Sequence, residues 1–146
     1  MTVKLICVGK MKERFYTDAY AEYAKRLSAY CRLELTEIPE STPEKEAAAI
    51  EKSCGKNGYV IAMAIEGKKL SSEEFAALLE RLALSGRSEV CFLIGGSVGL
   101  AGSIKNNSDF LLSMSDMTFP HHLARVMLAE QIYRAFKINE GSVYHK

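Results

Sequence analysis

The sequence predicts an α/β fold with a mainly parallel β-sheet and helices on both of its faces. Short apolar runs rich in β-forming residues alternate with longer stretches in which apolar residues recur every three or four positions. The run over residues 59–65 (YVIAMAI) is continuous, as expected for a central parallel strand that is covered on both faces. No repeat, low-complexity tract or linker interrupts this order. The 146 residues, 48% of them hydrophobic, are therefore expected to form a single domain, 1–146.

The expected elements follow from these runs and from capping residues. Ser71 and Glu74 have the spacing of a capping box, and Pro43 and Pro120 each suit the first turn of a helix. The expected strands span residues 2–8, 32–38, 59–65, 90–94 and 110–114, and residues 66–68 are expected to turn away from the third strand. The expected helices span residues 14–30, 41–53, 71–84 and 120–138, with a short irregular or helical piece at 103–107.

The first of these helices carries large side chains on one face. They recur at steps of three and four and are Tyr16, Tyr20, Tyr23, Leu27 and Tyr30. Aromatic side chains interleaved with basic residues can form a surface on which nucleic-acid bases stack. A stripe at helical spacing more often packs into the core, and we favour this interpretation.

Two of the expected strands end in loops that are suited to binding a ligand. The fourth strand runs into residues 95–99 (GGSVG), where backbone without Cβ atoms can approach a ligand closely. The fifth strand leads into residues 115–119 (SDMTF). Ligands of open α/β sheets bind beyond the carboxyl ends of the strands. The two loops are therefore expected to form two walls of one cavity.

Several common chemistries find no support in the sequence. The loop GGSVG does not match G-x-G-x-x-G, and it follows a late strand, whereas a dinucleotide-binding fingerprint normally follows the first strand. Neither a P-loop nor a G-x-S-x-G nucleophile elbow occurs. His121, His122 and His145 lack a metal-ligand pattern, so no metal is expected. The formal net charge of +1 does not by itself indicate a nucleic-acid partner.

The sequence favours a cytoplasmic protein without a membrane partner. The longest apolar run, residues 59–65, is too short to span a bilayer, and no signal-like apolar stretch stands at the amino terminus. The four cysteines are widely scattered, which suggests neither a disulfide framework nor a CxxC site.

Separated motifs along the whole chain are similar to those of one known family. They are residues 3–10 (VKLICVGK), 92–100 (FLIGGSVGL), 112–125 (LSMSDMTFPHHLAR), 130–138 (EQIYRAFKI) and 144–146 (YHK). In this order they resemble the ribosomal large subunit methyltransferase H family, which belongs to the SPOUT methyltransferases.

The resemblance implies a SPOUT-like fold with a C-terminal trefoil knot, a homodimer with a composite active site, and S-adenosylmethionine as the cofactor. It also implies methylation at N3 of a pseudouridine in 23S rRNA, so that the ribosome is the expected partner. Carried over by position, the cofactor-binding residues are expected to be Met63, Gly95, Gly96, Met114, Ser115, Asp116, Met117, Thr118 and Phe119. Ala64 stands where members of the family often have an acidic residue, so a polar contact is not expected at that position.

The resemblance also places the catalytic groups near the carboxyl terminus. His145 is expected to handle the substrate proton or contact the base, and Tyr144 to stack on the base or hydrogen-bond to it. Arg134, and with it Arg125, can hold phosphate or the target base. Because Glu130 precedes Arg134 by four residues on a helix, a simple ion pair is the alternative for that arginine. The tail keeps Tyr-His-Lys but lacks the Asn-His-Pro lead-in of some members.

Two other functions stay open on the sequence alone. A non-catalytic ribosome-associated module would keep a site for S-adenosylmethionine or a nucleotide, and would bind that ligand without methylating ribosomes. A small-nucleotide-binding regulator with a flavodoxin-like sheet would be distinguished by calorimetry with a panel of nucleotides.

Overall fold

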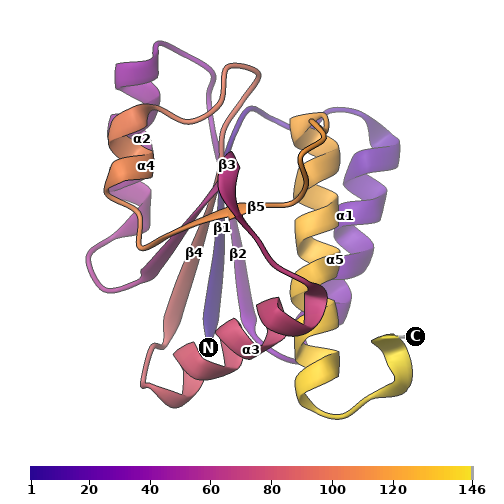
Figure 1. Ribbon diagram of the computed structural model, residues 1–146. Helices are drawn as coiled ribbons and strands as arrows, with labels where there is room; N and C mark the ends of the chain where they lie inside the picture. The colour runs from indigo at the N-terminus through magenta and orange to yellow at the C-terminus, as the bar shows by residue number, and fades with distance from the viewer. Residues whose placement is uncertain (146) are drawn as a thin grey trace.

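The computed structural model describes residues 1–145, with His145 described by its backbone alone, and it contains a five-stranded parallel sheet in the order β2-β1-β4-β3-β5 (Figure 1). The strands are β1 (Thr2–Val8), β2 (Arg32–Ile38), β3 (Tyr59–Lys69), β4 (Glu89–Ile94) and β5 (Phe110–Ser113). The helices are α1 (Arg14–Leu27), α2 (Pro43–Cys54), α3 (Ser72–Leu84), α4 (Gly102–Asn106) and α5 (His121–Asn139), followed by a short 3-10 turn, η1 (Val143–His145). The α/β class with a parallel sheet is confirmed.

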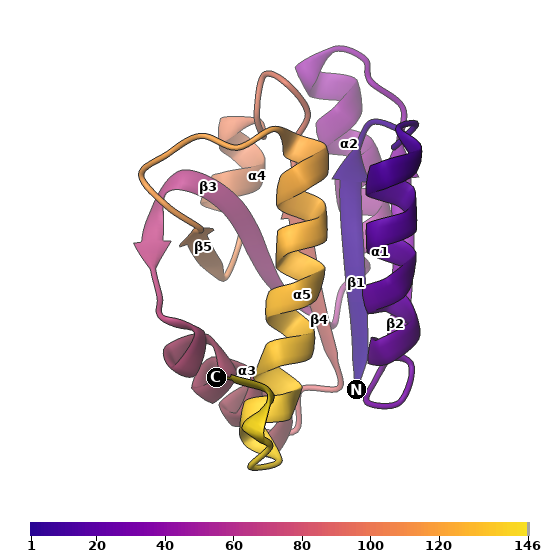
Figure 2. The same cartoon turned by 90° about the vertical axis from the view of Figure 1, so that its right-hand side faces the viewer.

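Helices cover both faces of the sheet, as expected. Helices α2 and α4 lie on one face and α1 and α5 on the other (Figure 1), and α1 and α5 run beside each other (Figure 2). Successive residues of a strand point to opposite faces, so the fully buried neighbours Leu5 and Ile6 of β1 enter two different clusters. Leu5 packs in the cluster under α1, α3 and α5, and Ile6 packs in the cluster under α2 and α4. Burial on both faces explains the continuous apolar runs in the sequence.

Capping residues fix the starts of α2 and α3, which the sequence predicted to within two residues. Ser71 and Glu74 form a complete capping box at the start of α3, with each side chain accepting a hydrogen bond from the other residue's backbone amide. At α2 the Thr42 hydroxyl accepts a hydrogen bond from the Lys45 amide, and Pro43 occupies the first helical position.

The tyrosine stripe of α1 faces the interior of the molecule. Tyr20 packs against the buried cluster that contains Leu27, which is fully buried. Helix α1 ends three residues earlier than expected, and Tyr30 lies beyond it, stacked on Phe136 of α5 at a ring-centroid distance of 5.7 Å. The core-packing interpretation of the stripe is therefore confirmed for these residues.

Strand β3 is longer than expected, because the chain leaves the sheet and then rejoins it. Leu112 of β5 pairs with both Met63 and Lys68 of β3, and residues 64–67 bulge out between these two pairings. The sequence analysis expected a turn at residues 66–68, and its bounds were wrong. Lys68 and Lys69 pair with β5, and the chain bulges at residues 64–67. Figure 1 shows β3 crossing β5. At this crossing, an added Cβ on Gly67 would come within 2.7 Å of the backbone carbonyl of Leu111.

Replacing Gly67 with alanine is expected to lower the free energy of unfolding by about 1–3 kcal/mol, because backbone of β5 cannot move aside as a flexible side chain would. Gly102→Ala is the matched control, since a Cβ at that position meets nothing within 4 Å. Urea denaturation would compare the two variants with the wild type. Equal midpoints for both variants would show that the crossing tolerates a side chain.

Within the described part of the chain, no helix is both long enough and apolar enough to cross a membrane.

Candidate functional site

A cavity of about 770 Å³ opens at the carboxyl ends of β3, β4 and β5. Its walls come from the bulge of β3, the glycine loop after β4 and the segment between β5 and α5, and Lys105 of α4 completes them. A cavity of this size, placed at this edge of a parallel sheet, is typical of a site for a small molecule. The two loops form walls of one cavity, as the sequence predicted.

The glycine loop after β4 is a tight turn that leaves bare backbone facing the cavity. The amide of Gly99 donates a hydrogen bond to the carbonyl of Gly96 over 3.0 Å, and Gly99 has a φ of +78°, which favours glycine. An added Cβ on Gly95 would lie 2.5 Å from the carbonyl carbon of Gly99. No larger residue fits at Gly95 without opening the turn.

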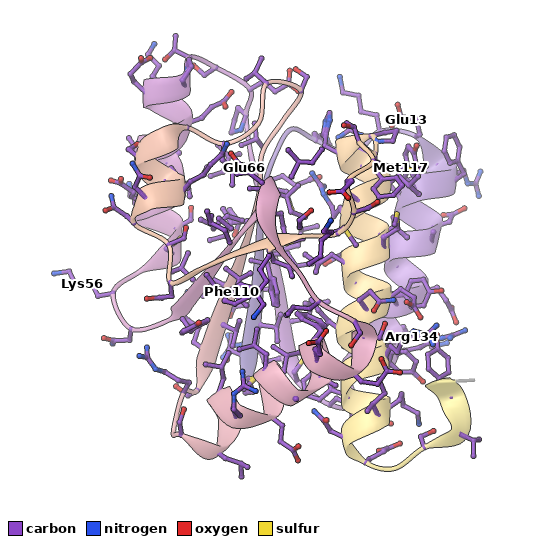
Figure 3. The ribbon with its side chains drawn as sticks, viewed as in Figure 1. Glu13, Lys56, Glu66, Phe110, Met117 and Arg134 are labelled. Atoms are coloured by element: carbon purple, nitrogen blue, oxygen red, sulfur yellow. The ribbon has the colours of Figure 1, made fainter. Side chains whose placement is uncertain are left out.

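The second loop is held by serine hydroxyls. The hydroxyl of Ser113 donates to the carbonyl of Ser115 over 2.9 Å, and the hydroxyl of Ser115 accepts a hydrogen bond from the Met117 amide over 3.0 Å. Met117 lies at the rim with its side chain 73% exposed, near the start of α5 (Figure 3). Val98 and Ile65 are also exposed at this rim. Three exposed apolar side chains around one opening form a surface suited to an apolar or aromatic group of a ligand.

Eight of the nine residues expected to bind the cofactor line the cavity. They are Met63, Gly95, Gly96, Met114, Ser115, Met117, Thr118 and Phe119. Asp116 is the ninth, and it does not belong to the wall. Its carboxylate pairs with the ammonium of Lys69 over 2.7 Å, and its side chain is 82% exposed.

The cavity wall also contains an ion pair that the sequence analysis did not identify. The ammonium of Lys105 donates to the carboxylate of Glu66 over 3.0 Å, and both residues line the cavity. The residue's own backbone amide and the Lys105 ammonium lower the pKa of the Glu66 carboxyl. The sequence pattern places Glu66 in a turn, so its contact with Lys105 was not expected. Spacing along the strand gave no signal for it, because residues 63–66 all line the cavity and the alternation of an ordinary strand does not hold in the bulge.

His121, at the start of α5, is a titratable residue of the wall. Burial and the neighbouring His122 lower the pKa of its imidazole, against the opposing effect of Glu40. The imidazole of His121 is therefore neutral at neutral pH, and one of its ring nitrogens can accept a proton or a hydrogen bond.

Arg125 does not face the cavity or the solvent. Its side chain is fully buried, and its two terminal nitrogens donate to Glu37 Oε2 over 2.6 Å and to the carbonyl of Gly9 over 3.0 Å. The same Glu37 oxygen accepts a hydrogen bond from the Met11 amide. The expectation that Arg125 holds phosphate or a base was wrong, because the arginine is used to fasten α5 to the ends of β1 and β2.

Arg134 and Tyr144 lie together, away from the cavity. Both donate to Glu130 Oε2, over 2.8 Å and 3.0 Å, and the guanidinium of Arg134 lies 5.0 Å from the centre of the Tyr144 ring. Arg134 follows the cavity residue Ala124 by ten positions along α5, which corresponds to about 15 Å of helix rise. Figure 3 shows Arg134 near the opposite end of α5 from Met117. The side chain of His145 lies outside the described residues.

A second cavity, of about 470 Å³, lies between the first cavity and this cluster along α5. Glu130 and Tyr23 line it, and Met63 and residues 112–114 form a wall that both cavities share. Through Glu130, the cluster of Glu130, Arg134 and Tyr144 therefore borders the second cavity.

Among the residues that the structure describes, no group of three or more His, Cys, Asp and Glu side chains is arranged to hold a metal ion.

Comparison with known proteins assigns the chain to a family. The family model described as "Predicted SPOUT methyltransferase" matches residues 1–145. The chain is 48% identical to the Ribosomal RNA large subunit methyltransferase H of Streptococcus equi subsp. zooepidemicus, over the full length of both proteins. A 50% identical protein with the same name occurs in Bifidobacterium adolescentis, again matched over both full lengths.

A solved structure shares the fold at low sequence identity. The probable methylase family protein of Haemophilus influenzae superposes with a TM-score of 0.63 at 10% identity, covering 99% of this chain and 70% of that one. On the family match and the full-length identities, this chain is a member of the SPOUT methyltransferases, within the ribosomal RNA large subunit methyltransferase H family.

Proposed function

We propose that this chain is an S-adenosylmethionine-dependent methyltransferase that modifies N3 of a pseudouridine in 23S rRNA, acting on ribosomes in the cytoplasm. The observation that carries the proposal is the cavity at the carboxyl ends of β3, β4 and β5, because eight residues expected from the family's cofactor site line it. The relatives that are 48–50% identical over their full length are named Ribosomal RNA large subunit methyltransferase H, which supports rRNA of the large subunit as the substrate.

The residues of the cavity fit this cofactor. Bare backbone at Gly95 and Gly96 allows close approach, and apolar Met63 and Phe119 offer contact surface for an adenine ring. When bound, S-adenosylmethionine supplies an electrophilic methyl group on a sulfonium. Such a transfer needs an in-line approach of the nucleophile, so the protein contributes mainly by positioning the two reactants and excluding water.

The residues near the carboxyl terminus are assigned to the substrate side. The imide nitrogen N3 must lose its proton, and His145 is the group proposed to handle it, with Tyr144 stacking on the base or hydrogen-bonding to it. Glu130 holds Arg134 and Tyr144 in one cluster, so its ion pair with Arg134 positions the guanidinium, whose central carbon lies 5.0 Å from the centre of the Tyr144 ring. The side chain of Arg134 is 23% exposed, and we propose that its guanidinium contacts a phosphate of the RNA.

These groups need a second copy of the chain to meet the cavity. About 15 Å of α5 separates the cavity from Arg134 within one subunit. A homodimer with two-fold symmetry can place the tail of one subunit beside the cavity of the other. It also brings a second set of lysines and arginines to a chain whose net charge is only +1, which favours binding to RNA. We therefore propose an obligate homodimer with composite sites.

We also infer the trefoil knot that family membership implies. The crossing at Gly67 supports it, since Leu112 of β5 pairs with the chain both before and after the bulge of β3, and the backbone of Gly67 lies close to that of Leu111. The chain then returns from β5, at the edge of the sheet, to the central strands, where Arg125 bonds to the Gly9 carbonyl. A close crossing of two strands, followed by a return of the chain to the interior of the sheet, is the kind of path expected for a threaded C-terminal segment.

Mass spectrometry of 23S rRNA fragments, from cells with and without this protein, tests the activity. We expect one methylated pseudouridine to lose its methyl group in the deletion strain and regain it when the gene is returned. His145→Ala should restore little of the methyl group while leaving the affinity for the cofactor nearly unchanged, and Val143→Ala, on an exposed neighbour, should restore it fully. A methyl group that persists in the deletion strain would exclude the proposed substrate. Cofactor binding without methylation would favour the non-catalytic module.

A further inference from the structure

The charges on the cavity wall suggest how one end of the ligand is recognised. Of the described side chains that line the cavity, Glu66 is the one acidic group and Lys105 the one lysine or arginine, and His121 is the one other titratable side chain. The charges of Glu66 and Lys105 are opposite in sign, and the two groups pair over 3.0 Å. The remaining wall consists of glycine, apolar and hydroxyl-bearing residues apart from that neutral imidazole. A ligand with one positive and one negative group therefore has a single place where both are matched.

Both residues stand on elements that are fixed by packing. Lys105 belongs to α4, whose neighbouring Ile104 is buried in the cluster under α2 and α4. Glu66 belongs to the bulge of β3, which the close crossing of Gly67 over Leu111 holds in place. The Lys105 side chain is 26% exposed and that of Glu66 is 55% exposed, so a ligand in the cavity can reach both groups. Rigid supports with accessible charged ends are suited to binding and orienting a ligand.

A second ion pair lies on the surface, outside the cavity. Lys69 and Asp116 pair over 2.7 Å, with side chains 55% and 82% exposed, and neither residue lines the cavity. Such an exposed pair contributes little to stability or binding. The two pairs share their chemistry and differ in their access to the cavity, which makes the second pair a matched control for the first.

We propose that Glu66 and Lys105 bind the amino-acid end of the cofactor as a zwitterion subsite. Lys105 binds the α-carboxylate and Glu66 binds the α-ammonium. Each side chain gives up its ion pair with the other and gains one with the ligand. Neither charge is left without a partner after the exchange, which keeps the cost of desolvation low. This inference rests on the proposed function. It assigns to Glu66, in the bulge of β3, the acidic contact that Ala64 cannot make.

The subsite predicts which charged group of the ligand each residue contacts. S-Adenosylhomocysteine keeps both amino-acid charges, whereas 5′-methylthioadenosine keeps the adenosine and sulfur but lacks the amino-acid end. Decarboxylated S-adenosylmethionine keeps the ammonium and lacks the carboxylate. Wild-type protein should therefore bind S-adenosylhomocysteine more than tenfold more tightly than 5′-methylthioadenosine.

Isothermal titration calorimetry with these three ligands tests the assignment on the full-length protein. Lys105→Met should weaken the binding of S-adenosylhomocysteine by about tenfold, as expected for one lost charge-assisted hydrogen bond, and leave that of 5′-methylthioadenosine unchanged. Glu66→Gln should weaken both S-adenosylhomocysteine and decarboxylated S-adenosylmethionine, whereas Lys105→Met should spare the decarboxylated compound. Lys69→Met, which breaks the ion pair outside the cavity, should change none of the affinities. Retained binding of 5′-methylthioadenosine shows that each variant is folded.

The outcomes separate this inference from the proposed function. Equal losses for S-adenosylhomocysteine and 5′-methylthioadenosine in Lys105→Met and Glu66→Gln would overturn the subsite, because the residues would then only shape the cavity. Unchanged affinity for S-adenosylhomocysteine in both variants would overturn it as well, with the cofactor assignment intact. Wild-type protein that binds none of the three ligands would overturn the proposed function and the subsite together.

Discussion

Replacing Arg125 with methionine is expected to lower the free energy of unfolding by about 3 kcal/mol or more, as for the breaking of other buried ion pairs. The Arg125 side chain is fully buried, and it donates both to Glu37, over 2.6 Å, and to the carbonyl of Gly9, over 3.0 Å. Methionine fills most of the space, but it removes the donor to the Gly9 carbonyl and leaves the Glu37 carboxylate with the Met11 amide and no positive charge beside it. Urea denaturation followed by circular dichroism would measure the loss.

The double variant Arg125→Met with Glu37→Gln distinguishes a lost pair from lost packing. Removing the negative charge together with the positive one leaves no uncompensated ion, so the double variant should be more stable than Arg125→Met alone. The amide oxygen that Glu37→Gln introduces can still accept the hydrogen bond from the Met11 backbone, which Glu37 accepts over 2.9 Å in the wild type. A double variant whose loss equals the sum of the two single losses would show that the charges are not coupled.

The same pair should make stability depend on pH in the acid range. Burial raises the pKa of the Glu37 carboxyl, but the hydrogen bonds from Met11 and Arg125 outweigh it and hold that pKa below its ordinary value of 4.5. A carboxyl whose pKa is lower in the folded state contributes stability above its unfolded pKa, and this contribution is lost as the pH falls through the folded pKa. Wild-type protein should lose stability as the pH falls below about 4.5, and Arg125→Met should lose less over the same range.

Local signals in the sequence were sufficient for most of the fold. The capping box at Ser71 and the proline at position 43 lie within a few residues of the boundaries that they set, so their effect does not depend on the rest of the chain. The bulge of β3 has a different origin. Its course is fixed by the contact of Gly67 with Leu111, forty-four positions away, and the residues around Gly67 contain nothing that predicts this contact.

The sequence predicted which loops form the cavity, but it did not predict which way each side chain in those loops points. Loops after neighbouring parallel strands must meet at one edge of a sheet, which is why most of the expected residues line one cavity. Asp116 lies inside the correct loop but turns outward to Lys69, a residue from another strand. The role of Arg125 was wrong for a similar reason, since its partner Glu37 is 88 positions away and the sequence does not show that the two meet.

Two inactive variants are expected to form an active enzyme when they are combined in one dimer. Gly95→Ala forces a Cβ within 2.5 Å of the Gly99 backbone and should abolish cofactor binding, and the double tail variant Tyr144→Ala with His145→Ala should remove the substrate side. Each homodimer should lose methyl transfer by about a hundredfold or more. A heterodimer joins the intact cavity of the tail variant to the intact tail of Gly95→Ala, so one of its two sites is complete. Purified through two different tags, it should reach about half the rate of a wild-type dimer.

Placing all three substitutions in one subunit gives the control for this experiment. Paired with a wild-type subunit, such a chain leaves each composite site with one defective half, so the heterodimer should be inactive although one of its subunits is intact. If cavity and tail of the same subunit worked together, the results would be reversed. The mixed dimer of Gly95→Ala and the tail variant would stay inactive, and the wild-type subunit beside the triple variant would keep about half the activity. The pair of measurements therefore decides between sites built across the two subunits and sites contained in one, whatever the absolute rate.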